Sequence, residues 1–267
     1  MKAKKDQLNK ENIAALLGDG FDVAVEECLD STNTELWKRG MAGAKDKTLL
    51  IAKSQRCGKG RLGRSFVSEE GGLYMSLLLR PSLIPADTAL ITPLAALAVA
   101  ETIEKHTGKN ALIKWVNDVF CDGKKVCGIL TEASLDPVTV QTNFVVVGVG
   151  LNVYAPEEGF PENIKGIAGA LFEADYCEEG LMDIIAADVA KGISDYSQRI
   201  NDKAPRDNYK KRCFVLGKDV TVHRGGESYE TKAVDIDDRF GLITEGTDGK
   251  PLVLSSGEIS VRVKDGV

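Results

Sequence analysis

The sequence GKGRLGR, residues 58–64, follows closely on the apolar run Leu49–Ser54, which predicts a β-strand leading into a glycine-rich basic loop. Three glycines let backbone N–H groups turn toward an anion, and three cations add positive charge. The residue order is not that of a P-loop, and no βαβ unit with a downstream acidic residue follows, as a dinucleotide-binding fingerprint requires. Taken alone, the loop fits an anion-binding site and a basic surface turn about equally well.

Outward from this loop, apolar periodicity predicts a larger α+β domain. Helices are expected after Asn9 as N-cap, from Ser31–Glu35 with Thr32 and Glu35 as a capping box, from Thr88 to His106 before Gly108, and over Gly180–Ile200. Strands are expected at Val23–Leu29, Leu49–Ser54, Gly72–Arg80, Ala111–Val116, Val119–Cys121, Val126–Ser134 and Asn143–Val153. Asp122-Gly123-Lys124 predicts a hairpin turn, and residues 155–175 predict a loop.

From Cys213 onward the pattern changes to short alternating strands between Gly- and Asp-rich turns. The expected strands are 218–223, 228–236, 240–245, 252–255 and 258–263. This pattern is typical of a small all-β barrel of about 50 residues. We therefore expect a short N-terminal arm with one helix over 1–20, a larger domain over 21–212 and a barrel over 213–267.

Composition limits the possible functions. The 267 residues carry a net charge of -6, so no basic excess suggests a nucleic-acid partner. Six cysteines form no CxxC pair and only two histidines occur, which disfavours a zinc site and favours reduced thiols in the cytoplasm. No apolar run approaches about 18 residues, so neither a membrane span nor a membrane partner is expected.

A second group of candidate binding or catalytic residues lies in two segments, Lys114-Trp115-Val116-Asn117-Asp118 and Lys125-Val126-Cys127-Gly128. A lysine at the start of a strand, beside a glycine that clears space, fits a pocket. Most lysines are solvent-exposed, however, so an ordinary hairpin explains the segment as well. Asn117-Asp118 fits a pair of Mg²⁺ ligands and is also a common turn dipeptide.

Two further segments have both a structural and a functional interpretation. Ser31-Thr32-Asn33 predicts a helix N-cap, and it also leaves N–H and hydroxyl groups near a polar ring such as a ureido group. Gly148-Val149-Gly150-Leu151-Asn152 predicts a core strand with bulges, or a place where a ligand approaches the backbone closely.

In this order and spacing, the segments resemble the biotin–protein ligase family. The resemblance rests on Ser31–Asn33, Gln55, the loop 58–64, Lys114–Asp118, Lys125 with Gly128, Gly148–Asn152 and the barrel ending Gly257–Arg262. It implies an α+β fold, with a catalytic domain like that of class II aminoacyl-tRNA synthetases, a mixed sheet flanked by helices, and a C-terminal SH3-like β-barrel. It also implies a cytoplasmic ligase that uses ATP and Mg²⁺ to convert biotin to biotinyl-5′-AMP and transfers it to a lysine of a biotin carboxyl carrier protein or domain.

The resemblance further implies residue roles. Biotin would contact Ser31, Thr32, Asn33, Gln55, Gly58, Lys59, Gly60, Arg61, Lys125 and Gly128. ATP or the adenylate would contact Lys59, Arg61, Arg64, Lys114, Trp115, Asn117 and Asn152. Arg61 and Lys125 would be the catalytic residues, and Asn117 or Asp118 would lie near Mg²⁺ or near the incoming carrier lysine.

The chain departs from the family's usual residues at several positions. Val116 replaces a proline, Phe66 replaces a tryptophan and Leu62 replaces a loop arginine. No tryptophan lies in residues 155–175 to cover the adenine, so Ile167 is the expected substitute. Because the mixed anhydride hydrolyses, we also expect residues 56–65 to order over it when ligands bind.

Three alternatives remain open from the sequence. A lipoate–protein ligase would share the fold and the adenylate chemistry. A biotin-sensing repressor would need a DNA-binding domain, for which too few residues precede Val23. A non-catalytic biotin-binding module would not need both Arg61 and Lys125. A homodimer through an exposed sheet edge also remains open.

Overall fold

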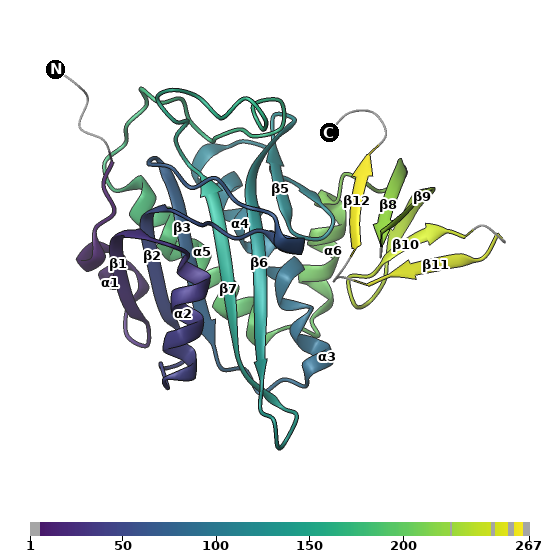
Figure 1. The fold of residues 1–267 in the computed structure, drawn as a ribbon, viewed down its shortest axis with the longest axis horizontal. Helices are drawn as coiled ribbons and strands as arrows, with labels where there is room; N and C mark the ends of the chain where they lie inside the picture. The colour runs from purple at the N-terminus through teal and green to yellow at the C-terminus, as the bar shows by residue number, and fades with distance from the viewer. Residues whose placement is uncertain (1–5, 225, 247–248, 256–258, 264–267) are drawn as a thin grey trace.

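The protein is described by a computed structural model that covers residues 6–224, 226–246, 249–255 and 259–263 (Figure 1). Its larger part is built on a seven-stranded mixed sheet in the order β1-β2-β3-β7-β6-β5-β4. Only β1 and β2 are parallel, and every other neighbouring pair is antiparallel. The strands are β1 (Asp22–Leu29), β2 (Thr48–Gln55), β3 (Gly72–Leu79), β4 (Leu112–Lys114), β5 (Asp118–Cys121), β6 (Lys124–Leu135) and β7 (Thr142–Asn152).

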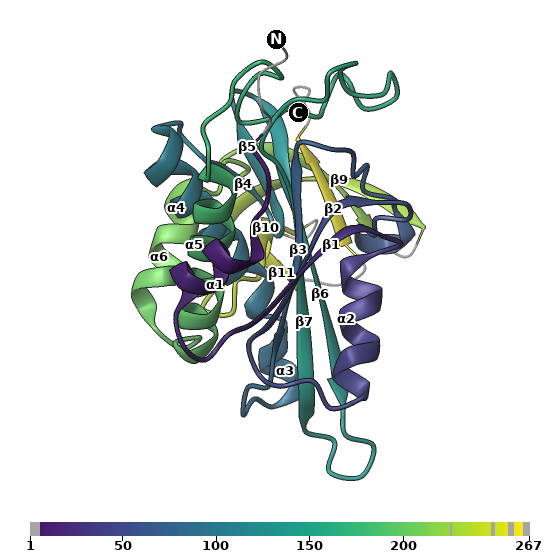
Figure 2. The ribbon, with the colours of Figure 1, turned by 90° about the vertical axis from the view of Figure 1, so that its left-hand side faces the viewer.

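Helices cover both faces of this sheet (Figure 2). On one face α2 (Thr32–Met41) packs on a small apolar cluster that includes Leu36, Leu50 and Phe144. On the other face α1 (Lys10–Leu17), α4 (Ile91–Thr107) and α5 (Leu181–Gln198) cover the main core. Successive side chains of β2 point to opposite faces of the sheet, which explains why the core forms two clusters. Leu50 points to the first cluster, while Leu49 and Ile51 point to the second.

The helix α4 is the central helix of the main core. Among the described residues, one helical stretch, Pro85–Thr107, is long and apolar enough to cross a membrane, but 72% of its apolar window is buried in the protein. It is therefore a core helix. The expected helix Thr88–His106 is split in the structure into α3 (Pro85–Thr88) and α4. Its predicted end is confirmed, because Gly108 is left-handed at φ 66° and donates to the Glu104 carbonyl.

The predicted capping box at Thr32 and Glu35 is wrong. Ser31 is the N-cap, and its hydroxyl accepts from the Thr34 N–H at 3.4 Å. Glu35 instead accepts from Arg39 one turn later. Thr32 is thus already the first helical residue, and its side chain can face β2 and β3.

The sequence did not predict α6 (Lys203–Arg212). Only Pro205 and Tyr209 of this helix are buried, so it carries almost no apolar periodicity. Tyr209 is fully buried and donates its hydroxyl hydrogen to the Val116 carbonyl at 3.2 Å. One buried aromatic ring therefore fixes α6 to the turn between β4 and β5.

The C-terminal part is a second, antiparallel sheet in the order β11-β10-β9-β8-β12. Its strands are β8 (Asp219–Arg224), β9 (Glu227–Ile236), β10 (Leu242–Glu245), β11 (Pro251–Leu254) and β12 (Ile259–Val263). They correspond to the five expected strands. Of the predicted barrel ending, Gly257 and Glu258 lie outside the described residues.

The turn Asp237–Gly241 of this second sheet lies against the larger part. The buried indole of Trp115 donates to the Phe240 carbonyl at 2.8 Å. The Phe240 ring packs edge-on against Tyr209, with 5.2 Å between ring centroids. Arg239 donates to Asp87 at 2.7 Å. The two sheets are therefore joined by specific contacts close to the β4–β5 turn.

Candidate functional site

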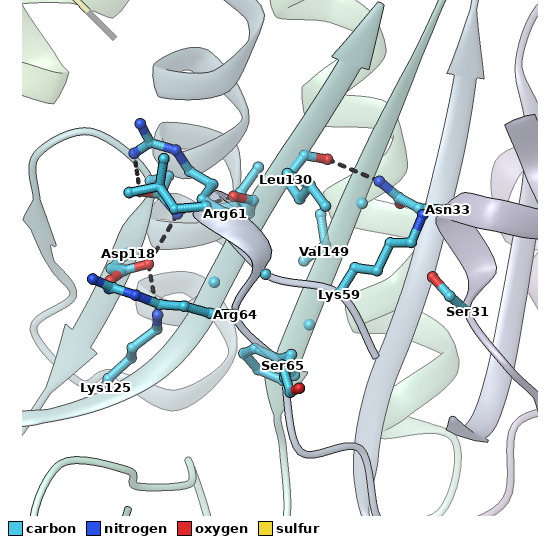
Figure 3. A pocket seen from close by; sticks show the side chains of 18 of the residues that line it. Ser31, Asn33, Lys59, Arg61, Arg64, Ser65, Asp118, Lys125, Leu130 and Val149 are labelled. Carbon is cyan, nitrogen blue, oxygen red and sulfur yellow. Dashed lines mark hydrogen bonds and ion pairs between the residues drawn. The ribbon is translucent and has the colours of Figure 1, made fainter. Parts of the chain in front are cut away.

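A cavity of about 420 Å³ opens at one end of the seven-stranded sheet (Figure 3). It brings together segments that are far apart in the sequence. The predicted site residues that line it are Ser31, Thr32, Asn33, Gln55, Lys59, Gly60, Arg61, Arg64, Lys114, Trp115, Asn117, Asp118, Lys125 and Gly128. Gly58 and Asn152 do not line it.

The basic loop forms a short hairpin over the cavity. The Gly60 N–H donates to the Arg64 carbonyl at 2.7 Å, and the Phe66 N–H donates to the Gly58 carbonyl at 2.8 Å. Its tip turns through Leu62 and Gly63, both with positive φ. The absence of a side chain at Gly58 has a structural reason, because a Cβ there would lie 2.3 Å from the Phe66 carbonyl oxygen. Ligand-induced ordering of this loop stays a prediction.

Arg61, Arg64 and Lys125 lie at one end of the cavity, whereas Lys59 lies at the other end beside Asn33 (Figure 3). Arg61 donates to the Asn117 side-chain oxygen at 2.8 Å, and Lys125 forms an ion pair with Asp118 at 2.7 Å. Asn117 in turn donates to Asp118 and to the Ile129 carbonyl. Burial lowers the pKa of Arg61, and the negative charge of Asp118 opposes that shift. The site therefore holds two positive groups in a partly dehydrated place, where they interact strongly with an anion.

Polar groups gather at the opposite end, where α2 begins. Ser31, Thr32 and Asn33 are almost fully buried. Gln55 accepts from the Thr32 N–H at 2.8 Å and donates to the Ser68 hydroxyl at 2.9 Å. The two ends of the cavity thus offer different chemistry. One end holds Arg61 and Lys125 with their partners, and the other holds buried hydrogen-bonding groups beside the Lys59 side chain (Figure 3).

Two residues that line the cavity floor were not assigned a role from the sequence. Phe66 packs against strands β6 and β7, where a Cβ on Gly150 would lie 2.6 Å from its ring and one on Gly128 would lie 3.2 Å from it. Gly148 likewise makes room for Asn33, since a Cβ there would lie 2.0 Å from the Asn33 side-chain oxygen. Gly148 and Gly150 line the cavity, and each also makes room for one of the protein's own side chains. Close approach of a ligand to these glycines stays a prediction.

Lys114, Trp115 and Asn152, which were expected to contact ATP, each make a different contact within the protein. The Lys114 ammonium lies 5.7 Å from the centre of the Phe120 ring. Trp115 is turned toward the second sheet by its bond to Phe240. Asn152 donates to the Gly169 carbonyl at 2.9 Å and thereby anchors residues 155–175. Its contact with adenine stays a prediction.

The segment 155–175 borders the cavity beside Lys125. The Lys125 N–H donates to the Ile167 carbonyl at 2.8 Å, and the Gly169 N–H donates to the Lys125 carbonyl at 2.9 Å. Ile167 lines the cavity with 57% of its surface exposed. Its apolar side chain is therefore exposed to the cavity, and its packing against adenine stays a prediction.

A resident metal site does not fit these residues. The described part of the chain contains no group of three His, Cys, Asp or Glu side chains that could hold a metal ion. The side-chain oxygen of Asn117 accepts from Arg61, and one oxygen of Asp118 is engaged by Lys125. At most one carboxylate oxygen remains, fewer than a protein-built metal cage requires.

Comparison with known proteins gives consistent results over both parts of the chain. Residues 25–152 match the model of the biotin/lipoate A/B protein ligase family, and residues 215–262 match the model of the biotin protein ligase C-terminal domain. The bifunctional ligase/repressor BirA of Bacillus spizizenii is 31% identical over 89% of this chain and 73% of its own length. The biotin–[acetyl-CoA-carboxylase] ligase of Mycobacterium tuberculosis is 32% identical over 86% of this chain and 85% of its own. The biotin protein ligase of Aquifex aeolicus, solved with biotin and ATP, superposes with a TM-score of 0.73 at 27% identity, covering 91% of this chain and 99% of that one.

Proposed function

The chain belongs to the biotin protein ligase family, and from this premise we propose how its cavity carries out the reaction. The enzyme activates biotin with ATP as biotinyl-5′-AMP and transfers the biotinyl group to a lysine of a carboxyl carrier protein. One observation supports the assignment of roles above all others. The cavity places Arg61 and Lys125 at one end (Figure 3). Its other end is lined by the polar groups of Ser31 and Asn33 and by the Lys59 side chain.

The first half-reaction needs those cations. The biotin carboxylate attacks the α-phosphorus of ATP, pyrophosphate leaves, and a mixed anhydride forms. Both reactants are anionic, so a positive group must offset their repulsion and the charge that develops in the transition state. Arg61 is proposed to bind the carboxylate and phosphate oxygens. Lys125, which now pairs with Asp118, is proposed to contact the α-phosphate when ATP binds.

Mg²⁺ is proposed to enter as part of the MgATP substrate. Asn117 and Asp118 do not form a resident metal site, as described above. Mg²⁺ usually keeps several waters and binds through one or two carboxylates plus substrate phosphates. The Asp118 carboxylate fits the role of a single such ligand.

The second half-reaction needs a deprotonated amine. An ordinary lysine has a pKa of about 10.4 and is mostly protonated at neutral pH. Asp118 lies beside the proposed anhydride position and is held there by Lys125 and Asn117. We propose that this carboxylate orients the carrier lysine and accepts its proton as the amine attacks. The carrier protein, a homodimer through an exposed sheet edge, and the absence of a nucleic-acid partner stay predictions.

Exchange of labelled pyrophosphate into ATP tests the adenylation step. Biotin-dependent exchange is expected in the wild type, and Lys125→Ala should lower its rate about 10²–10³-fold because a charge that stabilises the transition state is lost. Lys105→Ala is the matched control, since Lys105 pairs with Asp188 on the helical face. Tight biotin binding without exchange in the wild type would contradict the ligase function. An equal rate in Lys125→Ala and Lys105→Ala would contradict only the role of Lys125.

A further inference from the structure

The N-terminal arm, residues 6–9, is attached to the start of α5 by the carboxylate of Asp6. This carboxylate accepts from the Gly180 N–H at 2.9 Å and from the Met182 N–H at 2.8 Å. Gly180 is the N-cap of α5 and has no side chain with which to cap the helix. Asp6 therefore provides the cap from another part of the chain, and its negative charge also interacts favourably with the positive end of the helix dipole.

The same carboxylate bonds to Tyr154, which lies just after β7. The Tyr154 hydroxyl donates to Asp6 at 3.1 Å, and the Tyr154 N–H donates to the Gly71 carbonyl at 2.9 Å. Tyr154 is 8% exposed. Burial raises the pKa of Tyr154 and the Asp6 carboxylate raises it further, so the phenol stays a neutral donor. Asp6 thus fixes one buried aromatic ring to the first turn of a core helix.

Tyr154 contacts one end of a short segment, residues 167–172, which we call the strip. The Tyr154 ring packs against Phe172 with 5.9 Å between ring centroids. The Phe172 N–H donates to the Val153 carbonyl at 2.9 Å, and the Ala155 N–H donates to the Phe172 carbonyl at 2.9 Å. This end of the strip is therefore held against the residues that follow β7, with the Tyr154 ring as one of its supports.

The other end of the strip borders the cavity. The Gly169 N–H donates to the Lys125 carbonyl, and the Lys125 N–H donates to the Ile167 carbonyl. The backbone of Lys125 is thus bonded to the strip through both its N–H and its carbonyl, and the side chains of Lys125 and Ile167 both line the cavity. A shift of the strip would displace these two side chains, and small displacements of groups that position a substrate are costly.

We propose that Asp6 is a positioning residue for the nucleotide side of the cavity, which acts through Tyr154 and the strip and does not touch a ligand. This inference rests on the proposed function, in which Lys125 contacts the α-phosphate, and deepens it. The opposite end of the cavity, from Ser31 to Gln55, is formed by the start of α2 and the end of β2. Loss of the link from Asp6 is therefore expected to weaken the use of ATP and to leave the use of biotin unchanged.

The test measures two KM values by pyrophosphate exchange, for MgATP at saturating biotin and for biotin at saturating MgATP. Tyr154→Phe keeps the ring and removes the bond to Asp6, and Asp6→Ala removes the carboxylate. Each variant should raise the KM for MgATP about 3–30-fold and change the KM for biotin less than about twofold. Tyr176→Phe is the matched control and should keep both wild-type values. Its ring stacks on Phe172 at 4.4 Å, but its hydroxyl donates to Glu178.

The double variant Asp6→Ala/Tyr154→Phe separates one shared effect from two independent effects. If the two residues act through their bond, the double variant should raise the KM for MgATP no further than the larger single effect. Additive effects of the two substitutions would overturn the inference. An equal rise of both KM values, or an unchanged KM for MgATP in both single variants, would overturn it as well.

Amide hydrogen exchange provides a measurement that does not depend on activity. The Gly169 and Phe172 amides should exchange faster in Asp6→Ala and Tyr154→Phe than in wild type and Tyr176→Phe, because the strip opens more readily. Unchanged exchange at these amides would overturn the inference even in an active enzyme. If wild type shows no biotin-dependent pyrophosphate exchange, the proposed function fails, whereas faster amide exchange would still support the link from Asp6 to the strip. The two failures are therefore distinguishable.

Discussion

Gly148 lies where the first turn of α2 comes close to the sheet. Its lack of a side chain leaves room for the Asn33 side-chain oxygen, and Asn33 in turn reaches Leu130, Glu132 and Ser76. A single hydrogen atom in place of a side chain therefore permits a buried asparagine to bond to two strands, β3 and β6. The requirement for glycine here comes from steric exclusion, not from backbone conformation.

Substitution of Gly148 by alanine tests this role. The added methyl group should displace Asn33, break its bonds to β6, and lower the free energy of unfolding by about 1–3 kcal/mol. Biotin affinity should fall as well, because Thr32 lies on the same first turn of α2. Gly166→Ala is the control, because a Cβ there meets nothing within 4 Å. Urea denaturation and calorimetry measure both effects, and wild-type values for Gly148→Ala would refute the steric argument.

At the scale of single residues, sequence motifs predicted side chains that line the cavity and missed those that support them from behind. Arg61, Lys125 and Gln55 belong to recognisable segments, and all three line the cavity. Ser76 and Glu132 lie within ordinary strand patterns, so no local signal distinguishes them. Their importance arises from tertiary contacts between β3, β6 and α2, which a single sequence does not reveal.

The element that most needs a dynamic test is the basic loop at residues 56–65. It is held as a hairpin by few backbone hydrogen bonds, and Leu62 at its tip is 49% exposed. Segments with few buried apolar contacts open readily. Cys57, which immediately precedes the glycine run, is exposed and reports on the state of this loop.

Alkylation of Cys57 should slow at least several-fold when biotin and ATP are added, if the loop orders over them. The rate is measured by mass spectrometry after brief exposure to iodoacetamide. Cys177 is also exposed, lies outside the loop and is the internal control. Cys121, Cys127 and Cys213 are buried and should stay unmodified, since burial raises the pKa of Cys121 to about 11 and that of Cys213 to about 12. Equal rates at Cys57 with and without ligands would contradict loop ordering.

The accuracy of the predicted elements followed the strength of their periodicity. Strands with long apolar runs, such as β3 and β7, lie close to where the sequence placed them. The helix α6 was missed because ten mostly polar residues are held only by Pro205 and Tyr209. The cap of α2 was misplaced by one residue, because Ser31 and Thr32 are both common caps. In the structure Ser31 caps the helix, and the Thr32 side chain bonds to Gln55 instead.

At the scale of the whole molecule, the β4–β5 turn connects the cavity to the second sheet. Trp115 lines the cavity and also bonds to Phe240, while Val116 accepts from Tyr209 of α6. The pattern of short alternating strands and Gly- and Asp-rich turns predicted that a small all-β part would follow the larger one. They could not predict where the two parts meet, because the contact is made by a backbone carbonyl, which any residue provides.

Replacement of Trp115 by phenylalanine should lower the free energy of unfolding by about 1–3 kcal/mol, because the buried Phe240 carbonyl loses its donor. Trp37→Phe is the matched control, since Trp37 loses the same part of its ring while it packs edge-on against Phe144 on the opposite face of the sheet. Chemical denaturation of both variants measures the difference. If Trp115→Phe is no more destabilised than Trp37→Phe, the bond to Phe240 contributes little.

The bond from Trp115 to Phe240 also bears on how such a protein can be recombined. A C-terminal barrel taken from another protein would have to present a carbonyl at the height of the indole, an aromatic ring against Tyr209 and a cation toward Asp87. In a chimera that lacks these features, Trp115, which lines the cavity, would lose its hydrogen bond to the second sheet. The two parts are therefore not freely interchangeable modules, and successful grafts should be those that carry the turn Asp237–Gly241 along with the strands.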